Sequence, residues 1–267
     1  MGARPRVLVT GAGGQVGIAL RVHLPEATFL TRAELDVTDP VAVAEVLAGA
    51  DLVVHAAAMT DVDGCERAPE RAEAVNAGGA ANVAAAGARV IHLSTDYVFS
   101  GSAPGEYGED DPTGPLGAYG RSKLAGERAV LARPGNLVVR TSWVYGEGRN
   151  FVRSVLAAER AGKTLRVVDD QRGRPTWAGD LARAIAFFAG RDDSGILHVT
   201  GAGEPCTWAD LAEVVVGHPV ERITSEEFAA PAPRPRNSVL SLERARSVGV
   251  PLADWRDSVM RFLDGER

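Results

Sequence analysis

The sequence predicts an α/β fold in which a Rossmann-type, doubly wound parallel sheet carries a smaller C-terminal lobe. Three observations support this prediction. Short, β-branched apolar runs alternate with helical segments from the N-terminus to about residue 146, which is the order of a parallel sheet with helices on both faces. A glycine-rich turn follows the first apolar run directly. Beyond residue 146 the alternation stops, so we expect a second unit there.

Composition narrows the class of protein. The chain has 267 residues, of which 45% are hydrophobic and 24% charged, as in ordinary globular proteins. A formal net charge of -6, with no Lys/Arg run to offset it, argues against a nucleic-acid partner. Cys65, Cys206 and five scattered histidines suggest neither a disulfide framework nor a metal site. No run approaches the roughly 18 apolar residues of a membrane helix, and residues 1–5 leave no room for a signal peptide, so we expect a cytoplasmic protein.

The first predicted strand, residues 6–10, leads into a phosphate-binding type of turn. Gly11, Gly14 and Gly17 follow it with the spacing G-x-x-G-x-x-G, and a helix continues from there. Gly11 permits the tight turn, Gly14 lets a pyrophosphate approach the backbone, and Gly17 lets the helix pack closely on the strand. The helix N-terminus would face the phosphates. We therefore expect a dinucleotide site, with a purely structural turn as the alternative.

The second predicted strand, residues 27–30, bears on the choice of cofactor. Instead of the carboxylate that reads a ribose 2′-hydroxyl, Arg32 stands at its tip. A guanidinium there can accept a 2′-phosphate, which favours NADPH over NADH. The alternative is that Arg32 is only a solvated loop charge. Asp36 and Val37 follow this strand, and from their position alone we expect them in a loop that could cover the adenine.

Further strands are predicted at residues 52–55, 90–93, 137–140 and 196–199, and helices at 41–47, 69–86, 179–189, 207–216 and 255–263. We assign residues 1–146 and about 179–199 to a dinucleotide-binding domain, and about 147–178 and 200–267 to a lobe that closes over the sheet edge. Within the long helix 69–86, whose Ala/Gly-rich face suits tight packing, we expect Asn76 merely to brace the sheet. The glycine- and proline-rich stretch from Ser100 to Gly117 is either a flap over a substrate or a flexible connection.

A pair of side chains in the next helix can move a proton. Tyr119 and Lys123 are four residues apart, so they share one helix face. An ammonium beside a phenol favours the phenolate, so we expect Lys123 to lower the pKa of Tyr119 toward working pH. Ser94 and Thr95 end the preceding strand, and because strand residues alternate between faces, only one of the two hydroxyls should face a cofactor.

Several longer motifs accompany these residues. They cover residues 14–17, 56–63, 94–99, 119–127, 140–145, 170–176 and 234–238. With them the chain resembles the extended short-chain dehydrogenase/reductase superfamily, and within it the dTDP-4-dehydrorhamnose reductase family most closely. The resemblance covers almost the whole chain. It implies reduction by NADPH or NADH of the C4 ketone of dTDP-4-dehydro-6-deoxy-L-mannose, giving dTDP-L-rhamnose, and a second lobe that binds the substrate.

The resemblance also implies roles for individual residues. Tyr119 would be the proton donor, Lys123 would hold the nicotinamide ribose, and Thr95 rather than Ser94 would bind the substrate carbonyl. The cofactor would further be lined by Gly14, Gln15, Val16, Asp36, Val37, Ala58, Met59 and Thr60. The sugar would be contacted by Val62, Asp96 and Trp143, and the nucleotide half of the substrate by Asn150, Arg234 and Arg236.

Two positions depart from the family pattern, and two other functions stay open. His55 stands where the family usually has Asn. Ala19 stands where members that dimerise through magnesium have Glu, so we expect no metal and a monomer or weak homodimer. One alternative is a related dTDP-4-keto-deoxysugar reductase or a sugar-nucleotide epimerase. The other is a non-catalytic subunit of the methionine adenosyltransferase regulatory type, which need not keep Thr95, Tyr119 and Lys123.

Overall fold

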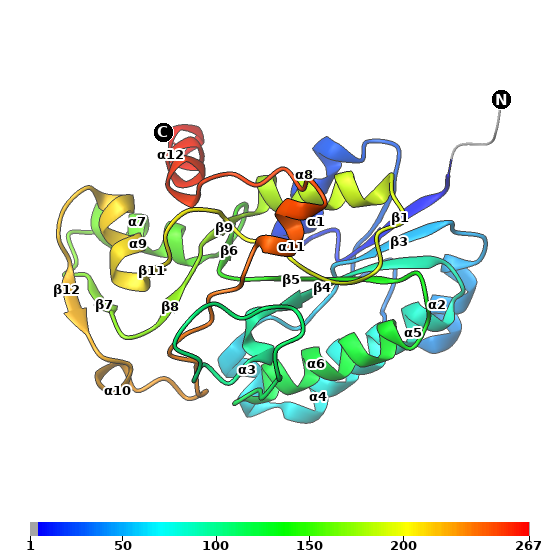
Figure 1. Cartoon of the computed structure of the whole chain (residues 1–267), viewed down its shortest axis with the longest axis horizontal. Coiled ribbons are helices and arrows are strands. Elements are labelled where there is room, and N and C mark those ends of the chain that lie inside the picture. The colour runs from blue at the N-terminus through cyan, green and yellow to red at the C-terminus, as the bar shows by residue number, and fades with distance from the viewer. Residues whose placement is uncertain (1–4, 267) are drawn as a thin grey trace.

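A computed structural model describes residues 5–266; the segment before Pro5, which bears on the signal-peptide prediction, lies outside the described residues. Its centre is a six-stranded sheet in the order β10-β5-β4-β3-β1-β2, with every neighbouring pair parallel (Figure 1). The strands are β1 (Val7–Thr10), β2 (Thr28–Leu30), β3 (Leu52–His55), β4 (Arg89–Thr95), β5 (Leu137–Thr141) and β10 (Gly195–His198). All six strands predicted from the sequence are therefore present, and the predicted fold class is confirmed.

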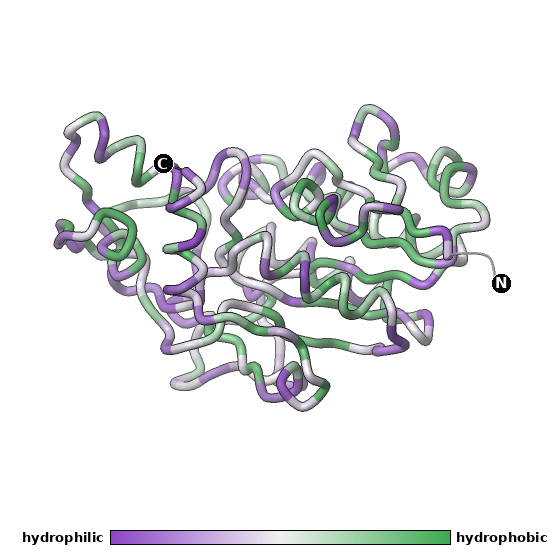
Figure 2. The backbone as a smooth tube through the Cα atoms, turned by 90° about the horizontal axis from the view of Figure 1, so that it is seen from above, coloured by the Kyte–Doolittle hydropathy of each residue, from purple (hydrophilic) through white to green (hydrophobic). Residues whose placement is uncertain are grey.

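Helices cover both faces of this sheet because successive strand residues point to opposite sides. Val9, Val54 and Val139 pack on one face with α1 (Gln15–His23) and α8 (Ala178–Ala189). Leu8 and Val53 pack on the other, which is covered by α2 (Pro40–Leu47), α5 (Gly79–Ala85) and α6 (Ala118–Leu131). Hydrophobic and hydrophilic residues alternate along the helices in Figure 2, as in helices that bury one side.

The predicted helix 69–86 is not regular along its length. It consists of α4 (Pro69–Glu73), a π-helical turn η1 (Ala74–Gly78) and α5. The π turn contains Asn76, whose buried side chain bonds the backbone of Met59. A widened turn of this kind commonly accompanies a functional constraint, and here it lets one side chain reach the neighbouring loop. Asn76 thus braces that loop.

The second lobe has its own hydrophobic cluster, which includes Val155, Leu211 and Trp255. Its elements are α7 (Phe151–Arg160), β7 (Arg166–Val168), β8 (Arg172–Gly173), β9 (Thr176–Trp177), β11 (Cys206–Thr207), α9 (Trp208–Val216), β12 (Glu221–Ile223), α10 (Ser225–Phe228) and α12 (Trp255–Gly265). The strand β6 (Val144–Tyr145) falls within the range predicted for the other domain, but it pairs with β9 and Tyr145 belongs to this cluster. In contrast, Ala245 of α11 (Glu243–Ser247) and Val250 pack in the core of the main sheet. The division into two domains stays a prediction. The segment that contains Ala245 and Val250 is assigned to the lobe but packs on the main sheet, so it does not follow that division.

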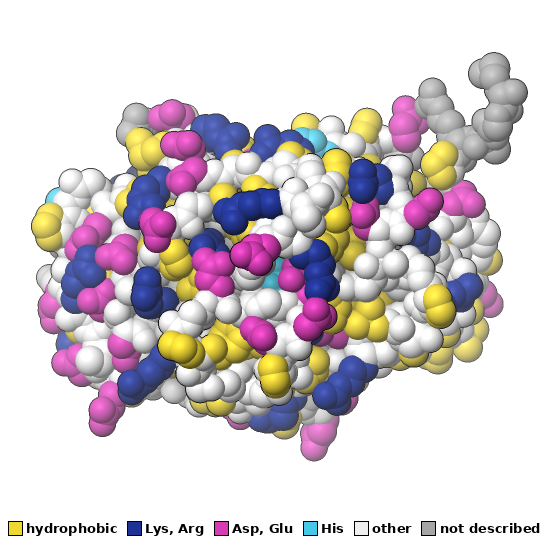
Figure 3. Space-filling view, in the orientation of Figure 1, with side chains coloured by type: hydrophobic (Ala, Val, Ile, Leu, Met, Phe, Trp, Pro, Cys, Tyr) yellow, Lys and Arg dark blue, Asp and Glu magenta, His cyan; other side chains and the backbone are white. Residues whose placement is uncertain are grey.

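The stretch from Ser100 to Gly117 is attached to the rest of the chain. Tyr107 pairs with Leu240 through backbone contacts, and its ring stacks on Phe99 with centroids 4.3 Å apart. On the face shown in Figure 3, Lys and Arg side chains lie among Asp and Glu side chains. Among residues 5–266, no helix has the length and hydropathy required to cross a membrane.

Candidate active site

The main cleft opens where the strand order changes direction. β1 connects to β2 on one side and lies beside β3 on the other, and ligands of doubly wound sheets bind at such a point, outside the carboxyl ends of the strands. The cleft has a volume of about 490 Å³. It is lined by most of the predicted site residues, namely Gly11, Gly14, Gln15, Val16, Gly17, Ala58, Thr60, Val62, Thr95, Asp96, Tyr119, Lys123, Trp143, Asn150 and Arg234.

The glycine turn fits a pyrophosphate. Gly11 has a φ of +72°, and a Cβ there would lie 2.5 Å from the backbone nitrogen of Ala57. A Cβ at Gly17 would lie 2.4 Å from the carbonyl oxygen of Gly11, so the close packing of α1 on β1 requires glycine. No side chain caps the N-terminus of α1, and the buried Oε1 of Gln15 has no hydrogen-bond partner among the described residues. The helix N–H groups therefore remain available to an anion.

A second cavity, of about 230 Å³, continues from the glycine turn on the side of β2. Seven residues predicted to contact the cofactor line it, and four of them do not line the main cleft: Arg32, Asp36, Val37 and Met59. Arg32 and Asp36 are exposed, and their charged groups lie 3.9 Å apart. Arg71 of α4 lines the same cavity and was missed by sequence reasoning. Two guanidinium groups thus border this cavity.

Ser94 and Thr95 both line the main cleft, and the expectation that only one of their hydroxyls faces the cofactor stays a prediction. The hydroxyl of Thr95 donates to Oδ1 of Asp96 at 2.9 Å, whereas the buried Oγ of Ser94 has no hydrogen-bond partner within residues 5–266. Burial raises the pKa of Asp96 to about 7, although hydrogen bonds from Ser238 and Thr95 act against this. Asp96 is therefore partly protonated near neutral pH.

Tyr119 and Lys123 lie in the cleft as predicted, but the expected effect of Lys123 on Tyr119 is wrong. Burial raises the pKa of Tyr119 above its usual value, opposed by the hydrogen bond between Tyr119 and Thr95. The Nζ of Lys123 instead donates to the carbonyl of Leu93 at 2.6 Å and lies 3.3 Å from Nε2 of His92. Burial lowers the pKa of Lys123 to about 8. Tyr119 is thus a neutral phenol, which is the form that donates a proton.

Asn76 joins the loop after β3 to the helix that carries Tyr119. Its Oδ1 accepts from the backbone N–H of Met59 at 2.8 Å, and its Nδ2 donates to the Met59 carbonyl at 3.1 Å. The same Nδ2 lies 3.0 Å from Oγ of Ser122 in α6. Since Ala58 and Thr60 flank Met59 in the cleft lining, this side chain fixes the cofactor side of the site against α6.

Two tryptophans close the cleft from the lobe. Trp143 has a φ of +48°, a strained conformation for a large residue. Its ring stacks on Trp208 of α9 with centroids 3.7 Å apart and planes 9° apart. It also lies against Gly173, where a Cβ would come within 2.6 Å of the ring. Trp208 lines the cleft and was also missed from the sequence.

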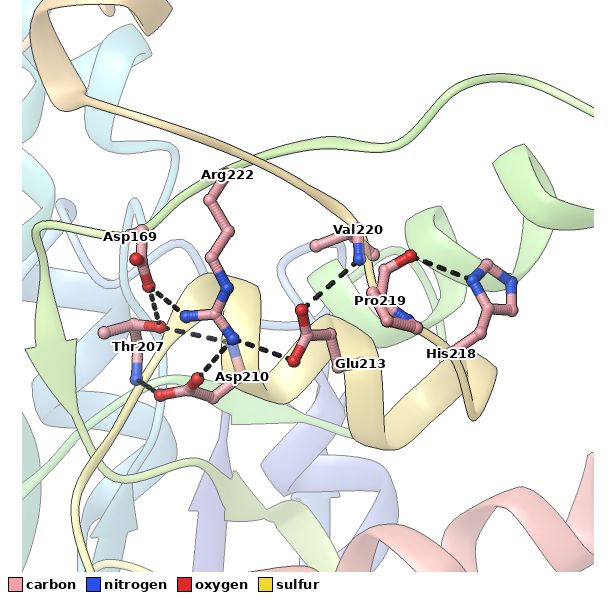
Figure 4. A network of polar contacts seen from close by, with 8 residues as sticks. All are labelled: Asp169, Thr207, Asp210, Glu213, His218, Pro219, Val220 and Arg222. Atoms are coloured by element: carbon pink, nitrogen blue, oxygen red, sulfur yellow. Dashed lines mark hydrogen bonds and ion pairs between the residues drawn. The ribbon is translucent and has the colours of Figure 1, made fainter.

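A network of charged groups fixes α9, and with it Trp208. Thr207 and Asp210 form a capping box at the start of the helix. Arg222 of β12 donates to Asp169 at 2.7 Å and to Asp210 and Glu213 at 2.8 Å each (Figure 4). The hydroxyl of Thr207 also bonds Asp169 at 2.7 Å. The strand β12 and the loop after β7 are thereby tied to the helix end that presents Trp208.

The three residues predicted for the nucleotide half differ in placement. Arg234 lines the cleft and pairs with Asp63 at 3.1 Å. Asn150 lines it as well, but its amide caps α7 and donates to the Gly146 carbonyl at 2.7 Å. Arg236 is exposed and lines neither cavity described above; its backbone carbonyl accepts from the N–H of Arg172. The structure therefore does not bring Arg236 to the site.

Comparisons with known proteins agree with this geometry. The family model described as the RmlD substrate binding domain matches residues 5–267 of this chain. The dTDP-4-dehydrorhamnose reductase of Mycolicibacterium smegmatis is 43% identical, over 95% of this chain and 84% of that protein. The chain belongs to the dTDP-4-dehydrorhamnose reductase family. The resemblance inferred from the sequence motifs is thus confirmed.

Two further relatives of this chain are informative about substrate and cofactor. A probable dTDP-4,6-dihydroxy-2-methyloxan-3-one 4-ketoreductase of Streptomyces antibioticus is 45% identical, over 95% of this chain and 93% of that protein. A dTDP-4-dehydrorhamnose reductase from Bacillus anthracis, solved in complex with NADP, has a TM-score of 0.93 and 33% identity, covering 98% of this chain and all of that one.

Proposed function

We propose that the protein reduces the C4 ketone of dTDP-4-dehydro-6-deoxy-L-mannose to give dTDP-L-rhamnose, with NADPH as the reductant. The observation that carries the proposal is the meeting of Thr95, Tyr119 and Lys123 with the glycine turn in one cleft. NADPH is favoured by Arg32 and Arg71 in the adjoining cavity, since guanidinium groups suit a 2′-phosphate. The Bacillus anthracis relative, solved with NADP, supports this choice.

The residues around the cleft would act in a defined order. The nicotinamide supplies a hydride when it is bound. The hydroxyl of Thr95, which donates to Asp96 in this structure, would turn to donate to the substrate oxygen instead and stabilise the charge that develops there. The neutral phenol of Tyr119 then transfers its proton to that oxygen. Lys123, held by the carbonyl of Leu93, keeps a positive charge beside the reacting groups.

The nucleotide half of the substrate would extend from Arg234 into a third cavity of about 210 Å³. Arg234 and Trp208 line both this cavity and the main cleft, and Phe228 and Phe151 add aromatic surface to it. A guanidinium suits the diphosphate, and aromatic rings suit a nucleobase. Of the nucleotide contacts predicted from the sequence, we propose that Arg234 binds the diphosphate, that Asn150 acts mainly through α7, and that Arg236 takes no part.

A second candidate is reduction of a different dTDP-4-keto-deoxysugar. It is favoured by the 45% identity to the probable ketoreductase of Streptomyces antibioticus, a value similar to that of the rhamnose-type relative. A binding-only subunit has less support, because it need not keep the neutral proton donor and the hydroxyl that bonds it, and both are present in the cleft. A monomer or weak homodimer without bound metal stays our prediction.

The experiment follows reduced-nicotinamide absorbance after the protein is mixed with NADPH and enzymatically prepared dTDP-4-dehydrorhamnose. Oxidation that requires the sugar nucleotide and yields dTDP-rhamnose is the expected result. The same assay with other dTDP-4-keto-6-deoxysugars distinguishes the second candidate, and NADH tests the cofactor choice. No oxidation with any of these ketosugars would contradict the reductase proposal.

A further inference from the structure

A row of polar side chains crosses the main sheet beneath α6 and leads to Lys123. Thr10, His55 and His92 lie directly opposite one another in the register of β1, β3 and β4. They point to the face that α6 covers. Strand residues two positions apart share a face, and Leu8, Val53 and Val90, each two positions before a member of the row, pack in the core on that face. Each of the three is at most 1% exposed.

Close contacts join the members of this row in order. Oγ1 of Thr10 lies 2.8 Å from Nδ1 of His55. The rings of His55 and His92 stack with centroids 5.1 Å apart and planes 25° apart. Nε2 of His92 lies 3.3 Å from Nζ of Lys123. His55, which stands where the family usually has Asn, therefore supports His92, the histidine nearest to Lys123.

We propose that His92 is a positioning residue for Lys123: its Nε2 accepts a hydrogen bond from the ammonium, and His55 holds its ring in place. An ammonium has three donors and no acceptor, so His92 must be neutral with its proton on Nδ1. Two donors of Lys123 are then committed to Leu93 and His92 of β4. The third is left for the cofactor ribose or Tyr119, a role that rests on the proposed function.

The charges around the pair agree with this arrangement. Burial lowers the pKa of His55 to about 3 and that of His92 well below its usual value, and the Lys123 ammonium acts in the same direction on both. Glu127, one turn further along α6, raises the pKa of Lys123 and is itself held by Arg140 at 2.8 Å. Lys123 is thus the cation of this group, and both imidazoles face it uncharged.

The test compares two substitutions of His92. His92→Phe keeps the ring and its stack but removes the acceptor, whereas His92→Gln retains an acceptor oxygen. Because an acceptor favours the charged amine, His92→Phe should move the alkaline limb of kcat/KM toward lower pH by about one unit. It should also weaken NADPH binding, measured by fluorescence titration, by about fivefold, which is the effect expected from one lost hydrogen bond. His92→Gln should restore both in large part. A native pH profile and native NADPH affinity in His92→Phe would overturn the proposal, as would equal losses in the two variants.

Nuclear magnetic resonance of the protein labelled with ¹⁵N-histidine tests the same point without sugar substrate, and serves if His92→Phe does not fold. We expect His92 to be neutral with its proton on Nδ1, and its Nε2 resonance to move in Lys123→Met. A proton on Nε2, or an Nε2 resonance unaffected by Lys123→Met, would overturn the proposal. If the native protein oxidised no NADPH with any ketosugar, the proposed function would fail, while these measurements would still decide the role of His92.

Discussion

The two walls of the cleft are built differently. The sheet wall presents Thr95 and Tyr119, which are hydrogen-bonded to each other, and Lys123, whose ammonium donates to the backbone carbonyl of Leu93. The lobe wall presents stacked Trp143 and Trp208 together with Arg234. Buried hydrogen bonds fix a proton and a charge in place, whereas rings and a guanidinium recognise a ligand by shape and charge. From this contrast we propose that the sheet wall carries out the chemistry and the lobe wall selects the substrate.

The largest effect should come from removing the proton donor of the sheet wall. Tyr119→Phe keeps the ring and loses only the hydroxyl, so kcat should fall by about 10³-fold, within the range for general acids. The dissociation constant for NADPH, measured by fluorescence, should stay within about twofold of the native value. Turnover that survives in Tyr119→Phe would mean that another group supplies the proton and that the sheet wall is assigned wrongly.

Asp96 makes the stability of the sheet wall depend on pH. Its pKa of about 7 in the folded protein lies above its ordinary value of 3.8, so between these pH values the folded state holds a proton that the unfolded chain has lost. Its contribution to the free energy of unfolding is therefore complete below about pH 4 and is lost as pH rises through about 7, by at most about 4 kcal/mol.

Denaturant unfolding of the native protein and Asp96→Asn from pH 4 to pH 8 measures this contribution. The native protein should lose stability relative to the variant as pH rises. Parallel curves would show that Asp96 is ionised in the fold throughout this range.

The two walls also differ in how far the sequence predicts them. Thr95 and Lys123 could be placed because strand ends and helix spacing are local patterns. Trp208 and Arg71 could not, because each reaches its cavity only through the packing of an element that has no motif of its own. The pKa of Tyr119 was predicted in the wrong direction for a related reason: spacing shows that Lys123 is near, but not that Leu93 and His92 engage its ammonium. The π turn at Asn76 likewise depends on the loop it reaches.

A substitution in the lobe wall should affect substrate recognition more than the chemistry. Trp208→Ala removes the ring that stacks on Trp143, and an aromatic pair is worth about 1 kcal/mol beyond its buried area. The KM for the sugar nucleotide should rise about tenfold while kcat changes less than threefold. Trp208→Phe keeps an aromatic ring and should recover most of this loss. If kcat fell instead, with KM unchanged, the walls would not divide their work as proposed.

The smallest effect should come from the charged network behind the lobe wall. Arg222 is 39% exposed at its side chain, and exposed ion pairs contribute only about 0 to 1 kcal/mol each. It joins β12 to α9, however, so Arg222→Met should loosen the helix end that presents Trp208 and raise the KM for the sugar nucleotide about threefold. The matched control is Arg191→Met, which removes a comparably exposed arginine paired with Asp193 after α8 and should leave KM unchanged. An equal KM in the two variants would show that Trp208 is held by its stacking contacts alone, and that the network stabilises the lobe without contributing to recognition.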